Sequence, residues 1–261
     1  MTRRVKDGCR KVRFSDFVII NPKITLEKGK EYPFIKMEDI SPGNRYVSFT
    51  GKRRFKGGGS KFMLGDVLFA RITPSLENGK IAQVEGITKG FGSTEFFVFR
   101  HREGISDSSF IYYLSVSDII RKPAEKSMFG ASGRQRVDLN VVQELWIEVP
   151  PLPNQRKIAA ILSAYDDLIE NNTRRIKILE EMAQTIYREW FVKFRFPGHE
   201  KVKMKDSELG PIPEGWMVKP SSQVLEINPR IKVDKESENP FVFMEDLSNT
   251  SMVINCRTKR K

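Results

Sequence analysis

The chain has 261 residues, 39% of them hydrophobic, and a formal net charge of +12 from 45 Lys and Arg against 33 Asp and Glu. A mean hydropathy of −0.42, no apolar run long enough to span a bilayer, and a charged rather than apolar N-terminus argue against a membrane-spanning or exported protein. Cys9 and Cys256 cannot form a disulfide framework, which favours a reducing cytoplasm, and the excess of cations favours a polyanionic partner.

Residues 1–150 are predicted to form a β-rich domain. Short β-branched or aromatic runs, separated by Gly, Pro, Asn and Ser, indicate strands. These runs cover residues 34–40, 45–50, 65–72, 80–87, 95–100 and 145–150. Residues 108–124 have helical apolar spacing, with Ser108 or Ser109 as the expected N-cap and Pro123 near the end. The expected unit is therefore a sheet domain that carries at least one helix.

A basic stretch interrupts this domain. Between residues 40 and 65 there are six Lys or Arg and no Asp or Glu. The six are Arg45, Lys52, Arg53, Arg54, Lys56 and Lys61. Three consecutive glycines, Gly57 to Gly59, exclude a helix here and predict a loop whose amides and cations can approach phosphates. The same stretch could equally be a hairpin tip without a ligand.

Two further segments combine cations with amide or hydroxyl side chains. Within residues 71–80, cations suit phosphates and the polar side chains suit base edges; the candidates are Arg71, Lys80, Thr73, Ser75 and Asn78. Within residues 132–136, the candidates are the types that pair bidentately with guanine or adenine edges, namely Arg134, Gln135 and Arg136. Either segment could instead be a structural turn.

Residues 154–191 are predicted to form one long helix, because this segment contains no Pro or Gly and Asn154 is a suitable N-cap. Its apolar positions follow a heptad pattern that drifts with the 3.6-residue period. The expected partner-facing residues are Ile158, Ile161, Leu162, Tyr165, Leu168, Ile169, Asn172, Ile176, Leu179 and Ile186. Asn172 in this seam would set the register. The alternative is a core helix packed on its own domain, but the length favours a coiled-coil arm.

The chain repeats itself at an offset of 207 residues. The segment from 21 to 41 is identical to the segment from 228 to 248 at 11 of 21 positions, without a gap. The motif Met37-Glu38-Asp39, for example, returns as Met244-Glu245-Asp246. The repeat predicts a duplicated module, of which the chain holds one whole unit and the start of a second.

Several segments resemble the specificity (S) subunits of type I restriction–modification systems. Residues 144–170 are similar to the junction at which a target-recognition domain passes through Pro-Pro-Leu into a long helix. Residues 207–220 resemble the start of the second recognition domain, and residues 92–100 and 131–150 resemble strand and loop segments of the family. The order of these segments along the chain is that of the family.

The resemblance implies an α+β chain with a recognition domain at residues 1–150, a spacer or dimerisation helix at 151–197 and the truncated start of a second recognition domain at 198–261. Each recognition domain would read one half of a split target in double-stranded DNA. The subunit itself would be non-catalytic and would position methyltransferase (modification) subunits and the restriction motor-nuclease subunit. S-adenosylmethionine, ATP and Mg²⁺ would belong to those partners.

The pattern of the family is incomplete here, since the second domain stops early and the helix that should pair with residues 154–191 is missing. Two chains could then pair as a homodimer and read a palindrome. The alternative is a degenerate remnant that acts as a coiled-coil protein and binds nucleic acid without sequence preference. An enzyme is not expected, because the Asn-Pro-Pro-aromatic motif of amino methylation is absent and His101 and His199 lack metal-ligand spacing.

Overall fold

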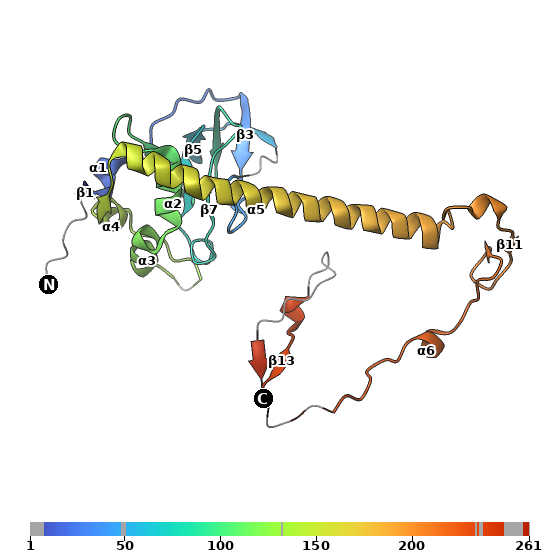
Figure 1. The fold of residues 1–261 in the computed structure, drawn as a ribbon. Coiled ribbons are helices and arrows are strands. Elements are labelled where there is room, and N and C mark those ends of the chain that lie inside the picture. Colours follow the sequence, from blue (N-terminus) through green and yellow to red (C-terminus); the bar gives the residue numbers. More distant parts are fainter. Residues whose placement is uncertain are drawn as a thin grey trace. The chain divides into compact units, whose positions relative to one another are not determined.

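The computed structural model describes residues 8–47, 51–131, 133–232, 234, 237–247 and 258–260 (Figure 1). It divides into two compact units, Met1–Glu181 and Met182–Lys261. The prediction of a mixed α+β chain with one long helix is confirmed. Of the strand predicted at 45–50, residues 48–50 lie outside the described part, and Tyr46 forms only an isolated bridge with Gln83.

The first sheet of unit one is antiparallel and buried on both faces. Its order is β2 (Val18–Ile20), β9 (Phe96–His101), β6 (Val67–Ala70) and β7 (Ile81–Gln83). Successive residues of a strand point to opposite faces. Phe69 and Phe97 therefore enter one hydrophobic cluster, and Leu68 and Val98 enter another. This explains why these strands read as continuous apolar runs rather than as alternating ones.

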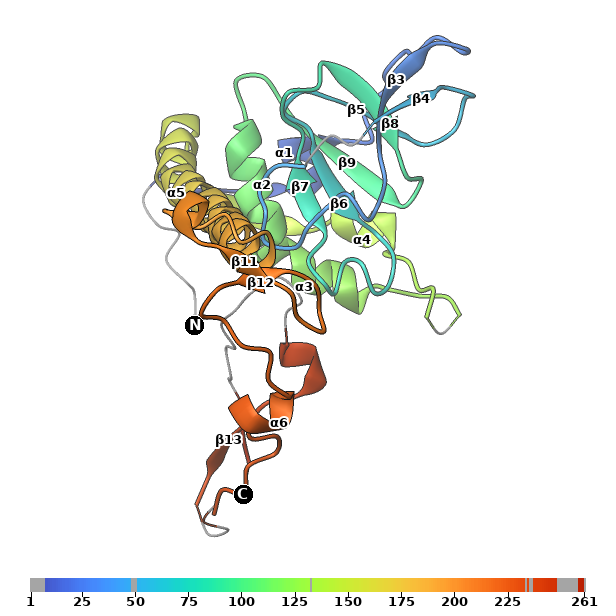
Figure 2. The same ribbon diagram turned by 90° about the vertical axis from the view of Figure 1, so that its right-hand side faces the viewer.

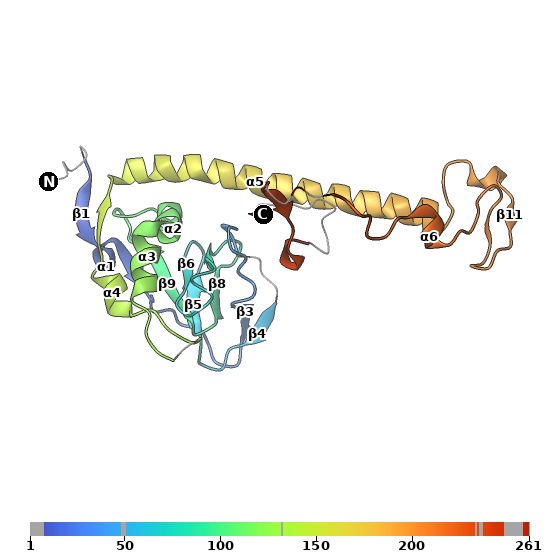
Figure 3. The same cartoon turned by 90° about the horizontal axis from the view of Figure 1, so that it is seen from below.

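Four short helices bury the first face of this sheet. They are α1 (Phe14–Phe17), α2 (Ser108–Val116), α3 (Asp118–Lys126) and α4 (Leu139–Gln143), seen beside β6 and β9 in Figure 3. The single helix predicted at 108–124 is wrong in two details. Ser117 is extended (φ −73°, ψ 159°) and breaks it into α2 and α3. The N-cap is Asp107, whose carboxylate accepts from the amide of Ser109 at 3.0 Å.

The second sheet lies on the other face of the first (Figure 2). Its order is β4 (Lys52–Arg54), β3 (Glu31–Ile35), β8 (Lys89–Gly92) and β5 (Ser60–Met63). Only the β3–β8 pair is parallel among its three pairings. Ile35 and Phe62 of this sheet pack with Leu68 of the first sheet in the second cluster. A separate pair, β1 (Arg10–Arg13) and β10 (Trp146–Val149), leads into the long helix.

The long helix α5 spans Leu152–Tyr187, which is 36 residues and about 54 Å at 1.5 Å per residue. The predicted N-cap at Asn154 is wrong, since the helix begins two residues earlier and the amide of Asn154 already donates to the carbonyl of Pro151 at 2.9 Å. Pro153 fits the first turn because its missing N–H would have no partner there. Within the described residues, no helix, α5 included, is both long and apolar enough to cross a bilayer.

Unit two is built from short elements. After α5 come a π-helical turn η1 (Arg188–Val192), a 3₁₀ turn η2 (His199–Lys201), helix α6 (Ser221–Val224) and a 3₁₀ turn η3 (Met244–Asp246). Its strands form two antiparallel pairs, β11 (Met204–Lys205) with β12 (Ile212–Pro213) and β13 (Asn239–Phe241) with β14 (Thr258–Arg260). Trp216 packs against Phe191 and Phe194, with ring centroids 5.9 and 5.4 Å apart.

Candidate nucleic-acid interface

Strand β4 presents three consecutive exposed cations, Lys52, Arg53 and Arg54. It is an edge strand, paired with β3 only. The Arg53 guanidinium carbon lies 4.2 Å from the ring centroid of Phe34, a cation–π contact that orients the charged group. Within the described residues, none of the three cations forms an ion pair. The strand therefore offers three exposed cations that have no ion-pair partner in the described part of the chain.

Two adjoining hollows follow the glycine turn between β4 and β5. One, of about 530 Å³, is lined by cations of β4 and by Lys56; the other, of about 500 Å³, is lined by Lys23, Lys61 and Arg71. They share Gly59 and Thr94 on their walls. Gly59 has φ +87°, and a Cβ there would lie 2.4 Å from the Gly92 carbonyl oxygen, so only glycine allows this close approach.

A single carboxylate joins two of the predicted segments. Glu95 accepts from Arg71 Nε at 3.2 Å and from Arg136 Nη2 at 2.7 Å. The hydrogen bond from the Arg136 guanidinium is the largest cause that holds the pKa of Glu95 below its usual value of 4.5. The two guanidinium groups are thereby held on one carboxylate, and Arg71 also lines the second hollow.

Backbone hydrogen bonds strengthen this junction. The amide of Thr73 donates to the Gln135 carbonyl at 3.0 Å, and the amide of Val137 donates to the Arg71 carbonyl at 2.8 Å. Parts of all three predicted segments, the basic stretch included, thus meet on one side of the domain. Sequence reasoning that selects cations as DNA contacts does not find Glu95, because Glu95 is acidic.

The side chains of the other predicted residues have different surroundings. The Lys80 ammonium group donates to the Met37 carbonyl at 2.9 Å, and the Thr73 hydroxyl lies 3.4 Å from the Met128 sulfur. Asn78 is exposed beside α3, in a hollow with Arg121. Ser75 is half-buried in the loop between Thr73 and Asn78. Arg134 is exposed and Gln135 is half-buried, and the role of each in base reading stays a prediction.

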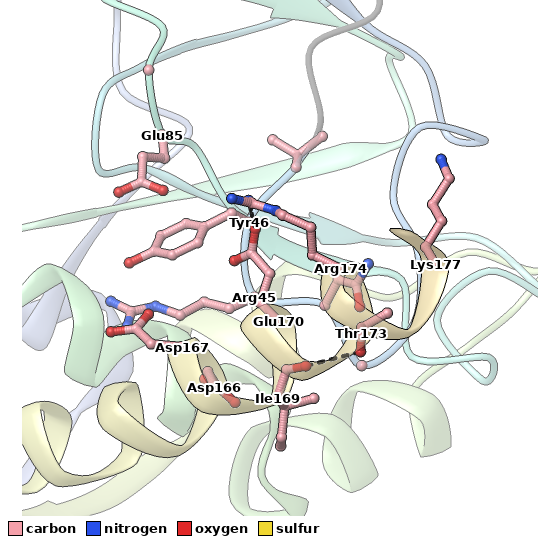
Figure 4. A pocket seen from close by; sticks show the side chains of 14 residues that line it. Arg45, Tyr46, Glu85, Asp166, Asp167, Ile169, Glu170, Thr173, Arg174 and Lys177 are labelled. Atoms are coloured by element: carbon pink, nitrogen blue, oxygen red, sulfur yellow. Dashed lines mark hydrogen bonds and ion pairs between the residues drawn. The ribbon is translucent and has the colours of Figure 1, made fainter. Parts of the chain in front are cut away.

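Arg45 requires a correction, because it is 6% exposed rather than part of an exposed basic loop. Its guanidinium donates to Gln83 Oε1 at 3.0 and 3.1 Å, to Ser109 Oγ at 2.6 Å and to Ser163 Oγ of α5. Figure 4 shows Arg45 in the cleft of about 660 Å³ between the domain and α5, whose walls carry Asp166 and Glu170. Arg45 therefore holds the helix on the domain and is not available to phosphates.

Tyr113 also connects the domain to α5. Its hydroxyl donates to Asp166 Oδ2 at 2.5 Å and accepts from Arg45 at 3.4 Å. Burial, followed by the hydrogen bond to Asp166, raises the pKa of Tyr113 to about 12. The phenol is thus protonated throughout the neutral range, as a donor to a carboxylate must be.

Two sides of α5 have different surroundings. The side on the domain is small and polar, with Gln155 and Ala159 buried and Ser163 and Asp166 half-buried. The predicted apolar seam lies roughly a third of a turn away at 3.6 residues per turn. It is exposed, with Leu168, Ile169 and Ile176 between 54% and 62% accessible. The seam therefore does not pack on its own domain, contrary to the alternative of a core helix.

Comparison with known proteins decides the family. The profile described as Type I restriction modification DNA specificity domain matches residues 11–181. The chain belongs to this family. Its resemblance to S subunits, noted from the sequence, is confirmed. The specificity subunit of the type I restriction enzyme MjaVIII from Methanocaldococcus jannaschii is 25% identical over 232 residues, covering 86% of this chain and 51% of that protein.

Solved structures show the same fold. An HsdS subunit from Thermoanaerobacter tengcongensis has a TM-score of 0.53 at 23% identity, over 70% of this chain and 47% of its own. A chain of a type I restriction–modification complex has a TM-score of 0.52 at 20% identity, over 92% and 60% respectively. The chain therefore spans about half the length of the M. jannaschii S subunit and of the T. tengcongensis chain.

Proposed function

We propose that this chain is a non-catalytic DNA specificity subunit of a type I restriction–modification complex. Residues 1–150 are the first target-recognition domain, residues 151–197 the spacer and dimerisation helix, and residues 198–261 part of a second recognition domain. The observation that carries the proposal is the convergence of β4, Arg71 and Arg136 on one side of a domain that matches the family over residues 11–181.

The same side of the domain is suited to double-stranded DNA. Cations along an edge strand attract phosphates, and their number sets the salt dependence of binding. Arginines beside hydroxyl and amide groups are the side chains that read base edges in the major groove. Arg71 and Arg136 are held by Glu95, and a carboxylate can itself accept from the amino group of cytosine. Base reading is therefore assigned to the Glu95 junction.

The partners follow from this role. The chain would position methyltransferase subunits and the restriction motor-nuclease subunit on DNA in the cytoplasm. S-adenosylmethionine, ATP and Mg²⁺ would be bound by those partners. Within the described residues, no group of three or more His, Cys, Asp and Glu side chains is gathered as a metal site.

The exposed seam of α5 supports pairing of two copies of the chain. Burying each of its large apolar side chains would contribute about 1.5–3 kcal/mol. Leu168, Ile176 and Leu179 are all more than half exposed in the single chain. A twofold dimer buries the same face of both helices and presents two identical recognition domains.

The test is methylome sequencing of a host that expresses the chain together with its modification subunit. We expect a methylated adenine in a new, bipartite sequence motif that is absent when the modification subunit is expressed alone. A palindromic motif would support the dimer, and an asymmetric one would contradict it. Expression of both proteins without any new motif would contradict the proposed function and favour a binder without sequence preference.

A further inference from the structure

The hairpin that carries the basic strand is present in both units. In unit one, Tyr32 pairs with Arg53 and Pro33 with Lys52. In unit two, Asn239 pairs with Arg260 and Pro240 with Lys259. Both partners of each pair are displaced by the same 207 residues that separate the sequence repeats. β13 and β14 therefore repeat β3 and β4 in the same register.

Local hydrogen bonds repeat as well. The Lys36 amide donates to Asp39 Oδ2 at 2.7 Å, and the Phe243 amide donates to Asp246 Oδ2 at 2.8 Å. Asn21 and its counterpart Asn228 both adopt the left-handed conformation, with φ +50° and +54°. The repeat is thus a repeat of structure, and corresponding positions of the two units can be compared.

The comparison separates residues that recur from residues that differ. None of the ten residues from 42 to 51 is identical to its counterpart at the offset of 207, and Arg45 is replaced by Met252. Identity then resumes at the basic strand, where Lys52 and Arg53 return as Lys259 and Arg260. Arg54 returns as Lys261, which keeps the charge. Three adjacent cations are therefore retained directly after a segment that has diverged completely.

Phosphates are the part of DNA that does not change with sequence. Two recognition domains that read different half-sites need different base contacts but the same backbone contacts. Resting on the proposed function, we infer that Lys52, Arg53 and Arg54 form a sequence-independent phosphate-binding strand; the sequence repeats these three cations at positions 259–261. The strand sets the position of the domain on the duplex, and base reading belongs to other segments.

The geometry of β4 agrees with this role. Its three cations are exposed on an edge strand, without ion-pair partners among the described residues. Side chains alternate along a strand, so Lys52 and Arg54 share one side of β4, whereas Arg53 lies on the other side over the Phe34 ring. Arg71 and Arg136 differ, because both are bound to Glu95. A cation that is already paired with a carboxylate gains less from a phosphate than an unpaired one.

Cations on an edge strand can also prevent strand-to-strand aggregation, and a binding experiment separates the two roles. The test variant of the full chain carries Lys52→Gln, Arg53→Gln and Arg54→Gln. The matched control carries Lys126→Gln, Arg156→Gln and Lys157→Gln, three exposed cations outside the hollows. Both variants lose the same net charge, and circular dichroism checks that each is folded. Binding is measured by fluorescence anisotropy on a duplex with the methylated motif and on a scrambled duplex, over a range of salt.

For the β4 variant we expect the same fold loss of affinity on both duplexes. The slope of log affinity against log salt should fall by about 0.9 per lost phosphate contact, or about 2–3 in total. The control should keep most of the slope. Loss confined to the motif duplex, an unchanged slope, or an equal loss in the control would overturn the inference. Equal binding of both duplexes by the parent chain would instead contradict the proposed function, and the salt slope on either duplex would still test β4.

Discussion

Arg45 and Arg53 carry the same guanidinium group in different surroundings. Arg45 is buried and donates to Gln83, Ser109 and a helix hydroxyl. Arg53 is exposed over the ring of Phe34. Composition and local sequence show that both are cations in a basic stretch, but they do not show what surrounds each one. The partners of Arg45 are 38 and 64 residues away for Gln83 and Ser109, so only the tertiary fold reveals its structural role.

Replacing Arg45 with Ala should loosen α5 from the domain. The change removes a charged donor from Gln83 and from the hydroxyls of Ser109 and Ser163, which should cost about 3 kcal/mol in the free energy of unfolding. Urea unfolding measures the loss, and hydrogen exchange should show faster exchange in the first turns of α5. The matched control Arg174→Ala removes an exposed guanidinium from the same helix and should change stability little. Equal effects of the two variants would contradict the role given to Arg45.

Glu95 should make stability depend on pH. The pKa of its carboxyl in the folded chain lies below the usual value of 4.5, chiefly because of Arg136. Its contribution is therefore fully present above pH 4.5 and is lost as the pH falls through the lower folded-state pKa. The difference in unfolding free energy between the parent and Glu95→Gln should narrow as the pH is lowered below 4.5. The control Glu103→Gln, in an exposed turn, should show no such narrowing.

At the scale of elements, helix α5 combines two interfaces. The face toward the domain carries small side chains. Ala159 and Ser163 let the helix approach the domain closely. The apolar seam faces elsewhere and remains accessible along most of the helix. In a helix of 36 residues, tertiary packing of the apolar face supplies most of the stability, and here that face is not covered by the domain. The seam is therefore the surface at which a second helix is expected.

Replacing Leu168 and Ile176 with Gln should weaken self-association. Two side chains from each of two chains lose burial worth about 1.5 kcal/mol or more each, so the dimer dissociation constant should rise at least a thousandfold. Sedimentation equilibrium measures it. The control Glu170→Gln with Arg174→Gln removes an exposed ion pair from the opposite side without changing net charge and should leave the constant nearly unchanged. A monomeric parent chain would contradict the pairing itself.

Elements with a strong local pattern could be predicted from the sequence, and others could not. The long helix was evident because its 3.6-residue period is uninterrupted after Pro153. The break at Ser117 was not, because Ser is tolerated within helices and only packing fixes its extended conformation. The sequence predicts β4 only as part of a loop, since a run of Lys and Arg has no alternation and its pairing with β3 is not local. The Glu95 junction joins residues 24 and 41 positions apart and has no local signal at all.

At the scale of the whole molecule, comparing the two copies of the repeat distinguishes residues that recur from residues that occur in one copy only. Unit one and the described part of unit two share a hairpin in one register and a turn in which an Asp carboxylate accepts from the amide three residues earlier. The intervening positions 42–51 differ throughout. The cations behind the net charge of +12 are therefore of two kinds. Some recur with the hairpin in both units, whereas others, such as Arg45, belong to one unit only.

The length of α5 should set the gap between the two halves of the target. In an antiparallel pair of α5 helices the recognition domains lie at opposite ends. Inserting seven residues, Glu-Ala-Ala-Lys-Leu-Ala-Ala, after Thr173 lengthens the helix by about 10.5 Å and keeps the seam nearly in line. The gap in the methylated motif should grow by about 3 base pairs, at 3.4 Å per base pair, while the half-sites stay the same.

Inserting two alanines instead rotates the following seam by about 200° and should abolish pairing and methylation. Methylome sequencing of both variants checks the prediction, and an unchanged gap in the seven-residue variant would contradict it.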